Sequence, residues 1–461
     1  MKVDPLGNER FKARYVAQGY SQQPGSDYTE TFAPTPKMSS VRMLMQIAAQ
    51  FDFMVHHMDV KTAYLNAPID AEIYLSQPQG YVEYDKDLKL VCKLRKSLYG
   101  LKQSGRNWHL LLHNFLLEKG FQQSKHDNCL YLYADSPNIS IILVWVDDIL
   151  MTANLTAAMK KIKQFLIKRF RMTDLGPVSC FLGIRFTQAE GKITMDQTDY
   201  LKEKLIKFQM DKCKPRTTPC ELAGYTENDA PFDNITLYRE MVGSLIYATT
   251  CTRPDLSWTV SKLSQHLSNP SLTHFTMLKH VFRYVAGTID YCLTFKKSEQ
   301  NLELIAYSDA DWASSPDRRS TTGYYFSLSL VGPALSWKTK KQPTVALSSC
   351  ESEYMALCAA AKEAIFLRNV LDDIGKVVGM SRECRPVTIF EDNQGALALA
   401  KNPVHHERSK HIDIKYHFTR ECVLNKQIEI TYVQSENNVA DILTKAATKL
   451  KLSKFRVALF G

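Results

Sequence analysis

Apolar residues recur at helical spacing in three segments of the first half of the chain. In residues 39–51 they form one face, which consists of Val41, Leu44, Met45, Ala48 and Phe51. Ser39 or Ser40 precedes this face and is the expected amino-terminal cap. A second helix is predicted over residues 106–120 and is stopped by Gly120. A basic amphipathic helix follows over residues 159–170, and its apolar positions are expected to pack in a core.

Between the last two helices lies a pair of strongly apolar segments. Residues 139–146 and 149–153 have the composition of buried strands, and Asp147 and Asp148 separate them. A tight turn between two such strands is typical of a β-hairpin. The sequence therefore predicts a hairpin with two adjacent acids in its turn.

The second half of the chain changes its pattern twice. Residues 213–234 are rich in turn-forming residues and are expected to be a linker, and residues 235–295 are mainly helical. Three strands are predicted over residues 302–309, 322–330 and 334–338, followed by a long helix from Glu351 to Ile374 that ends at Gly375. A strand over 387–392, a short helix, a strand over 428–433 and a final helix from Asn437 complete the pattern.

Length and composition agree with this division. A chain of 461 residues is too long for one ordinary core, so two or three domains are expected. No run of about 18 apolar residues indicates a membrane span, and the polar start resembles no signal peptide. The 11 cysteines form no CxxC pair, which argues for reduced intracellular thiols and against a disulfide scaffold. The net charge of +10 suits a polyanionic partner, although a solvated basic surface explains it equally well.

Three acids of the first half end or separate predicted strands: Asp59, Asp147 and Asp148. Two like charges about 4 Å apart repel by about 4 kcal/mol at an effective dielectric constant of 20. Adjacent aspartates between apolar strands therefore need a cation or open solvent, and hard oxygen ligands suit Mg²⁺. An isolated Asp-Asp pair is more often an ordinary hairpin turn, so the surrounding sequence has to decide.

That surrounding sequence resembles the copia-type (Ty1/copia) retrotransposon Pol polyproteins in residues, order and spacing. The segments are FKARYVAQGYSQQPGSDYTETFAP, DVKTAYLNAPIDAEIYLSQPQGY, VCKLRKSLYGLKQSGRNWH, WVDDILM, FRMTDLGPVSCFLGI and GSLIYATTCTRPDL. The resemblance implies a reverse transcriptase in which Asp59, Asp147 and Asp148 hold the catalytic metal ions. It also implies substrate-binding roles for Lys12, Arg14, Tyr64, Gly100 and Lys102.

The implied substrate-binding roles differ among these residues. Lys12 and Arg14 match a basic pair that holds the triphosphate, and Gly100 and Lys102 match the segment lining the nascent base pair. Tyr64 matches the residue that excludes a 2′-hydroxyl. Each has a structural alternative: core packing for Tyr64, and ordinary solvated surface charge for the cations.

The chain departs from the family pattern at Trp145, at Ala67, where a glycine is common, and at its start. Trp145 stands where the family usually has tyrosine before VDD, next to the primer terminus, which puts fidelity or rate in doubt. Relatives also carry a further fingers segment before Met1. We therefore expect truncated fingers, weak or no primer extension by the chain alone, and intact cleavage of RNA–DNA hybrids.

A second set of acids follows the order of a ribonuclease H fold: Asp309, Glu353, Asp392 and Asp441. Segments such as SDADWASSPDRRSTTGYYF, LSWKTKKQPTVALSSCESEY and RSKHIDIKYHF resemble the copia-type ribonuclease H domain. The resemblance makes these four acids metal ligands that activate water against a phosphodiester. It favours Asp309 over Asp311 and Glu353 over Glu351 by their places in the fold.

The histidines near this second set of acids are weaker evidence for a function. Cellular relatives of the fold place a histidine shortly before the last aspartate, and residues 432–441 contain none. The cluster His405, His406, His411 and His417 lacks cysteine partners at finger spacing, so we reject zinc. Arg408, Lys410 and His411 are expected either to contact nucleic-acid backbone or to form a solvated basic loop.

Together these features predict an α+β right-hand polymerase followed by an α/β ribonuclease H-like domain with a mixed five-stranded sheet. The expected domains are truncated fingers and palm (1–222), helical thumb and connection (223–300), ribonuclease H (301–446) and a C-terminal tail (447–461). Two Mg²⁺ ions, or Mn²⁺, are expected at each site.

The expected partners are an RNA template, a DNA primer and product, RNA–DNA hybrid and dNTPs, and no membrane is expected. The expected location is the cytoplasm, in virus-like particles. An inactive or domesticated nucleic-acid-binding remnant is the alternative, and its mark would be lost metal carboxylates; all seven are present. The fused ribonuclease H stretch argues against a host DNA polymerase.

Overall fold

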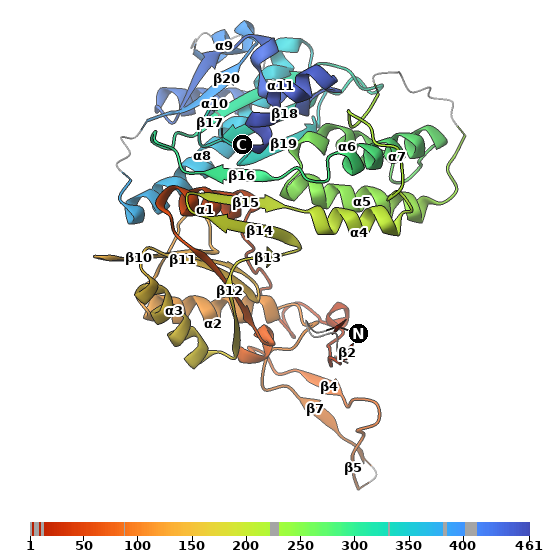
Figure 1. Cartoon of the computed structure of the whole chain (residues 1–461). Coiled ribbons are helices and arrows are strands. Elements are labelled where there is room, and N and C mark those ends of the chain that lie inside the picture. Colours follow the sequence, from red (N-terminus) through yellow and green to blue (C-terminus); the bar gives the residue numbers. More distant parts are fainter. Residues whose placement is uncertain are drawn as a thin grey trace. The chain divides into compact units, whose positions relative to one another are not determined.

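The computed structural model describes residues 2–3, 9–10, 13–86, 88–221, 230–330, 332–380, 385–401 and 413–461. The chain forms two compact units. The first comprises Met1–Pro36 and His56–Gly176, and the second comprises Lys37–Val55 and Pro177–Gly461. Both units combine helices with sheets (Figure 1). No described helix is long and apolar enough to cross a membrane.

The first unit is built on a six-stranded sheet with the strand order β12-β3-β11-β10-β9-β8. The strands are β3 (Val55–Val60), β8 (Gln122–Gln123), β9 (Leu130–Asp135), β10 (Asn138–Trp145), β11 (Asp148–Ala153) and β12 (Met172–Pro177). Helices α2 (Ser104–Glu118) and α3 (Thr156–Arg169) contribute to the core of this sheet. Trp108 and Leu112 of α2 meet Ile162 and Leu166 of α3 in that core. The predicted hairpin and both predicted helices are confirmed.

Short elements complete the first unit. They are β1 (Lys2–Val3) paired with β2 (Glu9–Arg10), β4 (Tyr74–Ser76) paired with β7 (Val91–Lys93), β5 (Tyr84–Asp85) paired with β6 (Leu88–Lys89), and the 3₁₀ helices η1 (Gly19–Ser21) and η2 (Ala63–Asn66). Ala17, Ile73, Leu98 and Leu101 form a small apolar cluster among them. This cluster joins the segment after Arg14 to the segment before α2.

A helical region and a four-stranded sheet form one part of the second unit. The sheet order is β13-β14-β15-β16, with β13 (Cys180–Phe181), β14 (Ile184–Ala189), β15 (Lys192–Asp196) and β16 (Leu293–Lys296). The helices are α1 (Met38–Phe51), α4 (Thr198–Lys207), α5 (Ile235–Cys251), η3 (Pro254–Leu256), α6 (Ser257–Ser264) and α7 (Leu272–Gly287). Residues of α4 to α7 share one buried apolar core.

A buried ion pair fixes the connection between these helices. Nε and Nη2 of Arg253 donate to the two carboxylate oxygens of Asp255, at 2.9 and 2.7 Å. Both side chains are almost fully buried. Tyr284 donates to the same carboxylate at 2.9 Å, and Arg253 also donates to Thr288. Because every polar group here has a partner, the network can remain buried without an uncompensated charge.

The second unit also carries the predicted five-stranded mixed sheet, with the order β19-β18-β17-β20-β21. Its strands are β17 (Ile305–Asp311), β18 (Thr321–Ser327), β19 (Ser336–Lys341), β20 (Val387–Glu391) and β21 (Ile428–Tyr432). β17, β18 and β19 pair antiparallel, whereas β17–β20 and β20–β21 pair parallel. This is the ribonuclease H-like arrangement expected from the sequence.

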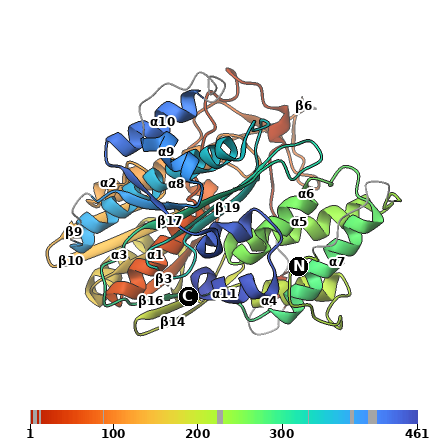
Figure 2. The ribbon, with the colours of Figure 1, turned by 90° about the horizontal axis from the view of Figure 1, so that it is seen from above.

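Helices cover this sheet and complete its connections (Figure 2). The long α8 (Ser349–Val378) packs along β17 and β18. α9 (Gln394–Lys401) and α10 (Asp413–Leu424) connect β20 to β21. The chain then forms the 3₁₀ helices η5 (Ser435–Asn437) and η6 (Val439–Leu443) and ends in α11 (Lys449–Phe460).

The structure corrects several predicted element ends. Helix α1 begins after Lys37 without a side-chain cap, and Ser39 and Ser40 are buried within it. Helix α8 continues through Gly375 to Val378, because Ile374 and Val378 extend its buried face and Gly379 supplies the left-handed cap with φ 71°. The final helix predicted from Asn437 is a 3₁₀ turn followed by a separate helix.

Residues 447–461, expected as a C-terminal tail, form α11 and bury Phe455 and Leu459. The helix α10 was not predicted. The expected domain limits at residues 222, 300 and 446 stay predictions. The compact units divide elsewhere, since α1 and β13 to β15 pack with the later part of the chain.

Candidate active sites

The first candidate site lies at the turn of the β10–β11 hairpin. Trp145 pairs with Asp148, so the two loop residues are Val146 and Asp147, and Asp148 is already the first residue of β11. Val146 has φ 55°, which is rare for a β-branched residue and costs about 1–3 kcal/mol. The indole nitrogen of Trp108 donates to the Val146 carbonyl at 2.6 Å. This contact from α2 holds the strained turn in place.

Strand β3 brings the third acid to the same end of the sheet. Asp59 precedes Val60, whose amide donates to the carbonyl of Asp147 at 2.8 Å. Burial raises the pKa of the Asp147 carboxyl, and the charges of Asp148 and Asp59 raise it further. All three carboxylates are partly buried. Three carboxylates gathered at one end of the sheet are able to bind a divalent cation, which would relieve their mutual repulsion.

A histidine that sequence reasoning missed contacts one of these acids. His57 is buried on β3, and its Nε2 lies 2.7 Å from Oδ1 of Asp148. His57 stands two residues before Asp59, so both project from the same face of the strand. The two-residue spacing between His57 and Asp59 was the sequence signal that could have identified His57. The contact fixes one oxygen of Asp148 and leaves the other for a further ligand.

Two tyrosines and one arginine lie beside the hairpin acids. The rings of Tyr64 and Tyr99 are 4.7 Å apart, and the Arg14 guanidinium lies 5.6 Å from the centre of the Tyr99 ring. Burial raises the pKa of both tyrosines, and the charge of Asp147 raises each further. Arg14, Tyr99, Tyr64 and Asp147 therefore form a continuous row. Tyr99 was missed, although it directly precedes the predicted Gly100.

Gly100 permits the close approach that places Arg14 in this row. It has φ 95°, and a Cβ there would lie 2.0 Å from the Ala17 carbonyl oxygen. The amide of Ala17 donates to the Tyr99 carbonyl at 2.8 Å. Lys102 is exposed and its ammonium lies 3.2 Å from the Tyr28 hydroxyl. Lys12 lies outside the described residues.

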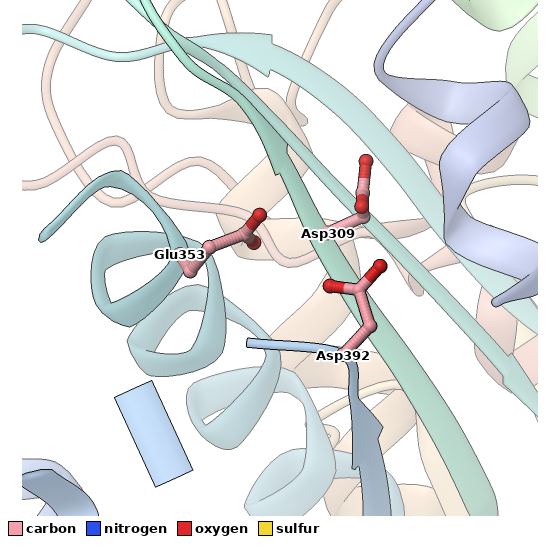
Figure 3. Close-up of side chains that lie close together, drawn as sticks. All are labelled: Asp309, Glu353 and Asp392. Carbon is pink, nitrogen blue, oxygen red and sulfur yellow. The ribbon is translucent and has the colours of Figure 1, made fainter. Parts of the chain in front are cut away.

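The second candidate site gathers three acids from three elements of the second unit. Asp309 lies on β17, Glu353 on the second turn of α8, and Asp392 directly after β20. One oxygen from each lies within 4.8 Å of the others. Figure 3 shows the three carboxylates turned toward one another. Asp309 is 3% exposed and Glu353 is 7% exposed, whereas Asp392 is half-buried.

The structure distinguishes these acids from their neighbours in sequence. Glu351 accepts from the Leu347 amide at 2.8 Å and so caps the start of α8, while Glu353 faces the cluster. Asp311 does not belong to the close group within the described residues. Glu391 is a further acid that sequence reasoning missed. It is fully buried, and burial raises its pKa, with the charge of Asp392 adding to the effect.

Asp441 lies near this group but is separately paired. Both of its oxygens form ion pairs, one with Lys445 and the other with Lys451. The hydroxyl of Thr444 donates to Asp309. The segment approaches β18 closely because Gly323, opposite Asp309, has no side chain; a Cβ there would lie 2.6 Å from Thr444 Cγ2. Asp441 is thus placed beside the cluster rather than within it.

The residues of the second site fit a divalent metal ion. Burial raises the pKa values of Glu353 and Asp309, and neighbouring carboxylates raise them further. Among the described residues, Oε2 of Glu353 is buried without a hydrogen-bond partner. An acceptor without a donor, within reach of two further carboxylates, is the donor set that Mg²⁺ or Mn²⁺ prefers.

Trp337 of β19 is bound within the fold, and most of the histidine and basic residues singled out from the sequence lie outside the described part. The Trp337 indole donates to the Thr249 carbonyl at 2.8 Å, and the buried Arg42 lies over its ring at 3.9 Å. Its ring therefore stabilises the fold. His405, His406, Arg408, Lys410 and His411 lie outside the described residues. His417 is exposed on α10.

The fold class is that of a reverse transcriptase region joined to a ribonuclease H-like domain, and each of the two parts carries a group of acids. The family described as reverse transcriptase (RNA-dependent DNA polymerase) matches residues 1–222. A transposon Ty5-1 protein of Saccharomyces cerevisiae is 34% identical over 310 residues, which are 66% of this chain and all of that protein. The chain belongs to the family of Pol polyproteins of Ty1/copia-type retrotransposons.

Longer relatives match almost the whole chain. The retrovirus-related Pol polyprotein from transposon TNT 1-94 of Nicotiana tabacum is 37% identical over 456 residues, 96% of this chain and 33% of the relative. That from transposon RE1 of Arabidopsis thaliana is 38% identical over 451 residues, 97% of this chain and 30% of the relative. The chain therefore spans about a third of the length of these polyproteins.

Solved structures give a weaker likeness. The prototype foamy virus protease-reverse transcriptase is 13% identical and covers 90% of this chain and 70% of that chain, with a TM-score of 0.23. The PFV RNase H domain is 20% identical, and the match covers 32% of this chain and 93% of that chain, also with a TM-score of 0.23.

Proposed function

We propose that the chain copies RNA into DNA and cleaves the RNA strand of the resulting hybrid, with two divalent metal ions at each of two separate sites. The observation that carries this proposal is the convergence of Asp309, Glu353 and Asp392 within 4.8 Å. Membership in the retrotransposon family supports the polymerase part. The substrates are an RNA template, a DNA primer, dNTPs and RNA–DNA hybrid.

At the second site, the residues supply the ligands and the orientation for phosphodiester hydrolysis. Divalent ions held there would activate water against phosphorus and stabilise the departing 3′-oxygen. Glu353 presents a buried oxygen that has no competing donor among the described residues. Thr444 donates a hydrogen bond to one oxygen of Asp309 and so restricts the rotation of this carboxylate within the cluster. Burial of these acids strengthens their attraction for a cation because the local dielectric constant is low.

At the first site, Asp59, Asp147 and Asp148 would hold the ions for attack of a primer 3′-hydroxyl on a dNTP. The row that leads away from Asp147 offers two aromatic rings, Tyr64 and Tyr99, followed by the cation of Arg14. We assign the triphosphate to the Arg14 end and the sugar to Tyr64. His57 positions Asp148 by its 2.7 Å contact.

Separate inactivation of the two sites tests the proposal. Asp148→Asn should abolish primer extension on an RNA template and leave hybrid cleavage unchanged, whereas Glu353→Gln should do the reverse. Asp135→Asn is a matched control, because Asp135 is exposed at the end of β9 in the same sheet as Asp148. Both activities should require Mg²⁺ or Mn²⁺.

Loss of both activities in either folded variant would overturn the assignment of two independent sites. A wild-type chain that binds hybrid tightly but neither extends nor cleaves, with either metal, would instead identify a nucleic-acid-binding remnant.

A further inference from the structure

The carboxylate of Asp441 is held by two lysines that the sequence does not mark as functional. Asp441 is 1% exposed. Its Oδ1 pairs with Lys445, four residues later, and its Oδ2 lies 2.5 Å from Nζ of Lys451. Lys445 lies in the loop after η6, and Lys451 belongs to the first turn of α11. Both oxygens of this buried acid are therefore engaged by ammonium groups.

The neighbouring lysine of α11 makes different contacts, so the pairing with Asp441 is specific. Nζ of Lys454 donates to the Glu436 carbonyl at 2.6 Å and to Oδ1 of Asn437 at 2.8 Å. It anchors α11 to the segment before Asp441 without contacting the carboxylate. The helix start is fixed independently, because the Thr448 side chain accepts from the Lys451 amide. Lys451 therefore projects toward Asp441 from a defined position.

The segment that carries the paired acid is bound to β17, the strand that carries Asp309 of the three-carboxylate cluster. Asn438 donates to the Ser308 carbonyl at 2.8 Å, and Thr444 donates to Asp309, so the segment on both sides of Asp441 is bound to β17. Lys445 also interacts electrostatically with Asp309 and Asp311. The cluster Asp309, Glu353 and Asp392 is complete for one ion without Asp441.

We propose that Lys445 and Lys451 are positioning residues that hold Asp441 as an internal counter-ion and thereby weaken the binding of the second metal ion relative to the first. The inference rests on the proposed ribonuclease H function. A divalent cation and an ammonium group compete for the same carboxylate oxygens, so an ion at Asp441 has to displace at least one lysine. Among the described residues, no lysine forms an ion pair with Asp309, Glu353 or Asp392, so the first ion meets only the longer-range charge of Lys445 near Asp309.

Calorimetric titration of the whole chain with Mn²⁺ tests the inference without measuring catalysis. The polymerase acids are replaced in every sample by Asp148→Asn, so that the second unit dominates the binding isotherm. Lys451→Met should tighten the weaker step about tenfold, the change expected when one charge-assisted hydrogen bond no longer competes. The stronger step should change little. Lys451→Arg, which keeps the cation, should resemble the parent.

Lys454→Met is the matched control, because it removes a lysine from the same helix one turn away from Lys451 and leaves both contacts of Asp441 in place. Lys445→Met is the second variant, and it should also tighten the weaker step. Circular dichroism verifies that each variant is folded. An unchanged or weakened second step in both Lys451→Met and Lys445→Met would overturn the inference, as would equal tightening in Lys454→Met.

Failure of the proposed function is distinguishable from failure of this inference. If wild-type chain cleaves hybrid but the two lysine variants bind Mn²⁺ as the parent does, only the lysine proposal fails. If the variants show the predicted tightening while wild-type chain never cleaves hybrid, the ion pairs act as proposed and the nuclease assignment fails.

Discussion

Replacing Glu353 with glutamine should stabilise the chain in the absence of metal ions while abolishing hybrid cleavage. Glu353 is buried within 4.8 Å of oxygens of Asp309 and Asp392. Each pair of charges at that distance repels by about 3 kcal/mol at an effective dielectric constant of 20. Protonation of one acid relieves part of this repulsion. We therefore expect a gain of about 1–3 kcal/mol in the free energy of unfolding at pH 8, or a few degrees in Tm.

The pH dependence of this gain follows from the direction of the pKa shift. Burial and the neighbouring acids raise the pKa of Glu353 in the folded chain above its ordinary value of 4.5. The wild-type chain is therefore destabilised as pH rises above that value toward the folded pKa, and the effect is lost below it. The advantage of the Glu353→Gln chain should grow from pH 4.5 to pH 8.

Thermal unfolding followed by circular dichroism in EDTA measures this difference. Glu351→Gln is the comparison, because Glu351 caps the same helix and its loss should lower Tm slightly. Added Mg²⁺ should raise Tm of wild-type chain more than that of Glu353→Gln. A Glu353→Gln chain that is no more stable than wild type at pH 8, or whose advantage shrinks with rising pH, would refute the reasoning.

Three further variants probe other parts of the account. Tyr64→Ala should raise incorporation of GTP relative to dGTP, and an unchanged ratio would show that the ring only packs. Gly100→Ala should weaken dNTP use in primer extension, seen as a raised KM, because its Cβ would lie 2.0 Å from the Ala17 carbonyl oxygen. Arg253→Met should lower the free energy of unfolding in urea by about 3–5 kcal/mol, because it leaves Asp255 buried and unpaired. A loss below 1 kcal/mol would mean that water reaches Asp255.

The sequence predicted those parts of the sites that sit at regular places in regular elements. Asp309 lies near the end of β17 and Asp392 directly follows β20, so the parallel pairing of these two strands brings the acids together. Glu353 was chosen over Glu351 from the resemblance to the ribonuclease H fold, and it lies on the second turn of the predicted long helix. The hairpin carrying Asp147 follows from two apolar strands around a short turn.

Contacts between distant segments were not predictable in the same way. Lys451 lies in a stretch that reads as a charged tail, and only the fold of α11 brings its ammonium to Asp441. The end of α8 was misplaced because Gly375 is a common stop signal, yet burial of Val378 outweighs its low helix propensity. Tyr99 joins Tyr64 only through the close approach of two backbone segments at Gly100.

The most direct measurement of the central claim is cleavage of a labelled RNA strand annealed to DNA, in Mg²⁺, by wild-type chain and by Asp392→Asn. The control is Asp372→Asn, because Asp372 pairs with Arg368 on α8, five turns beyond Glu353. The account predicts metal-dependent cleavage by wild type and by the control, and loss of at least 100-fold in Asp392→Asn, roughly the effect of removing one preorganised catalytic group. Equal cleavage by wild type and a folded Asp392→Asn chain would contradict the assignment of this site.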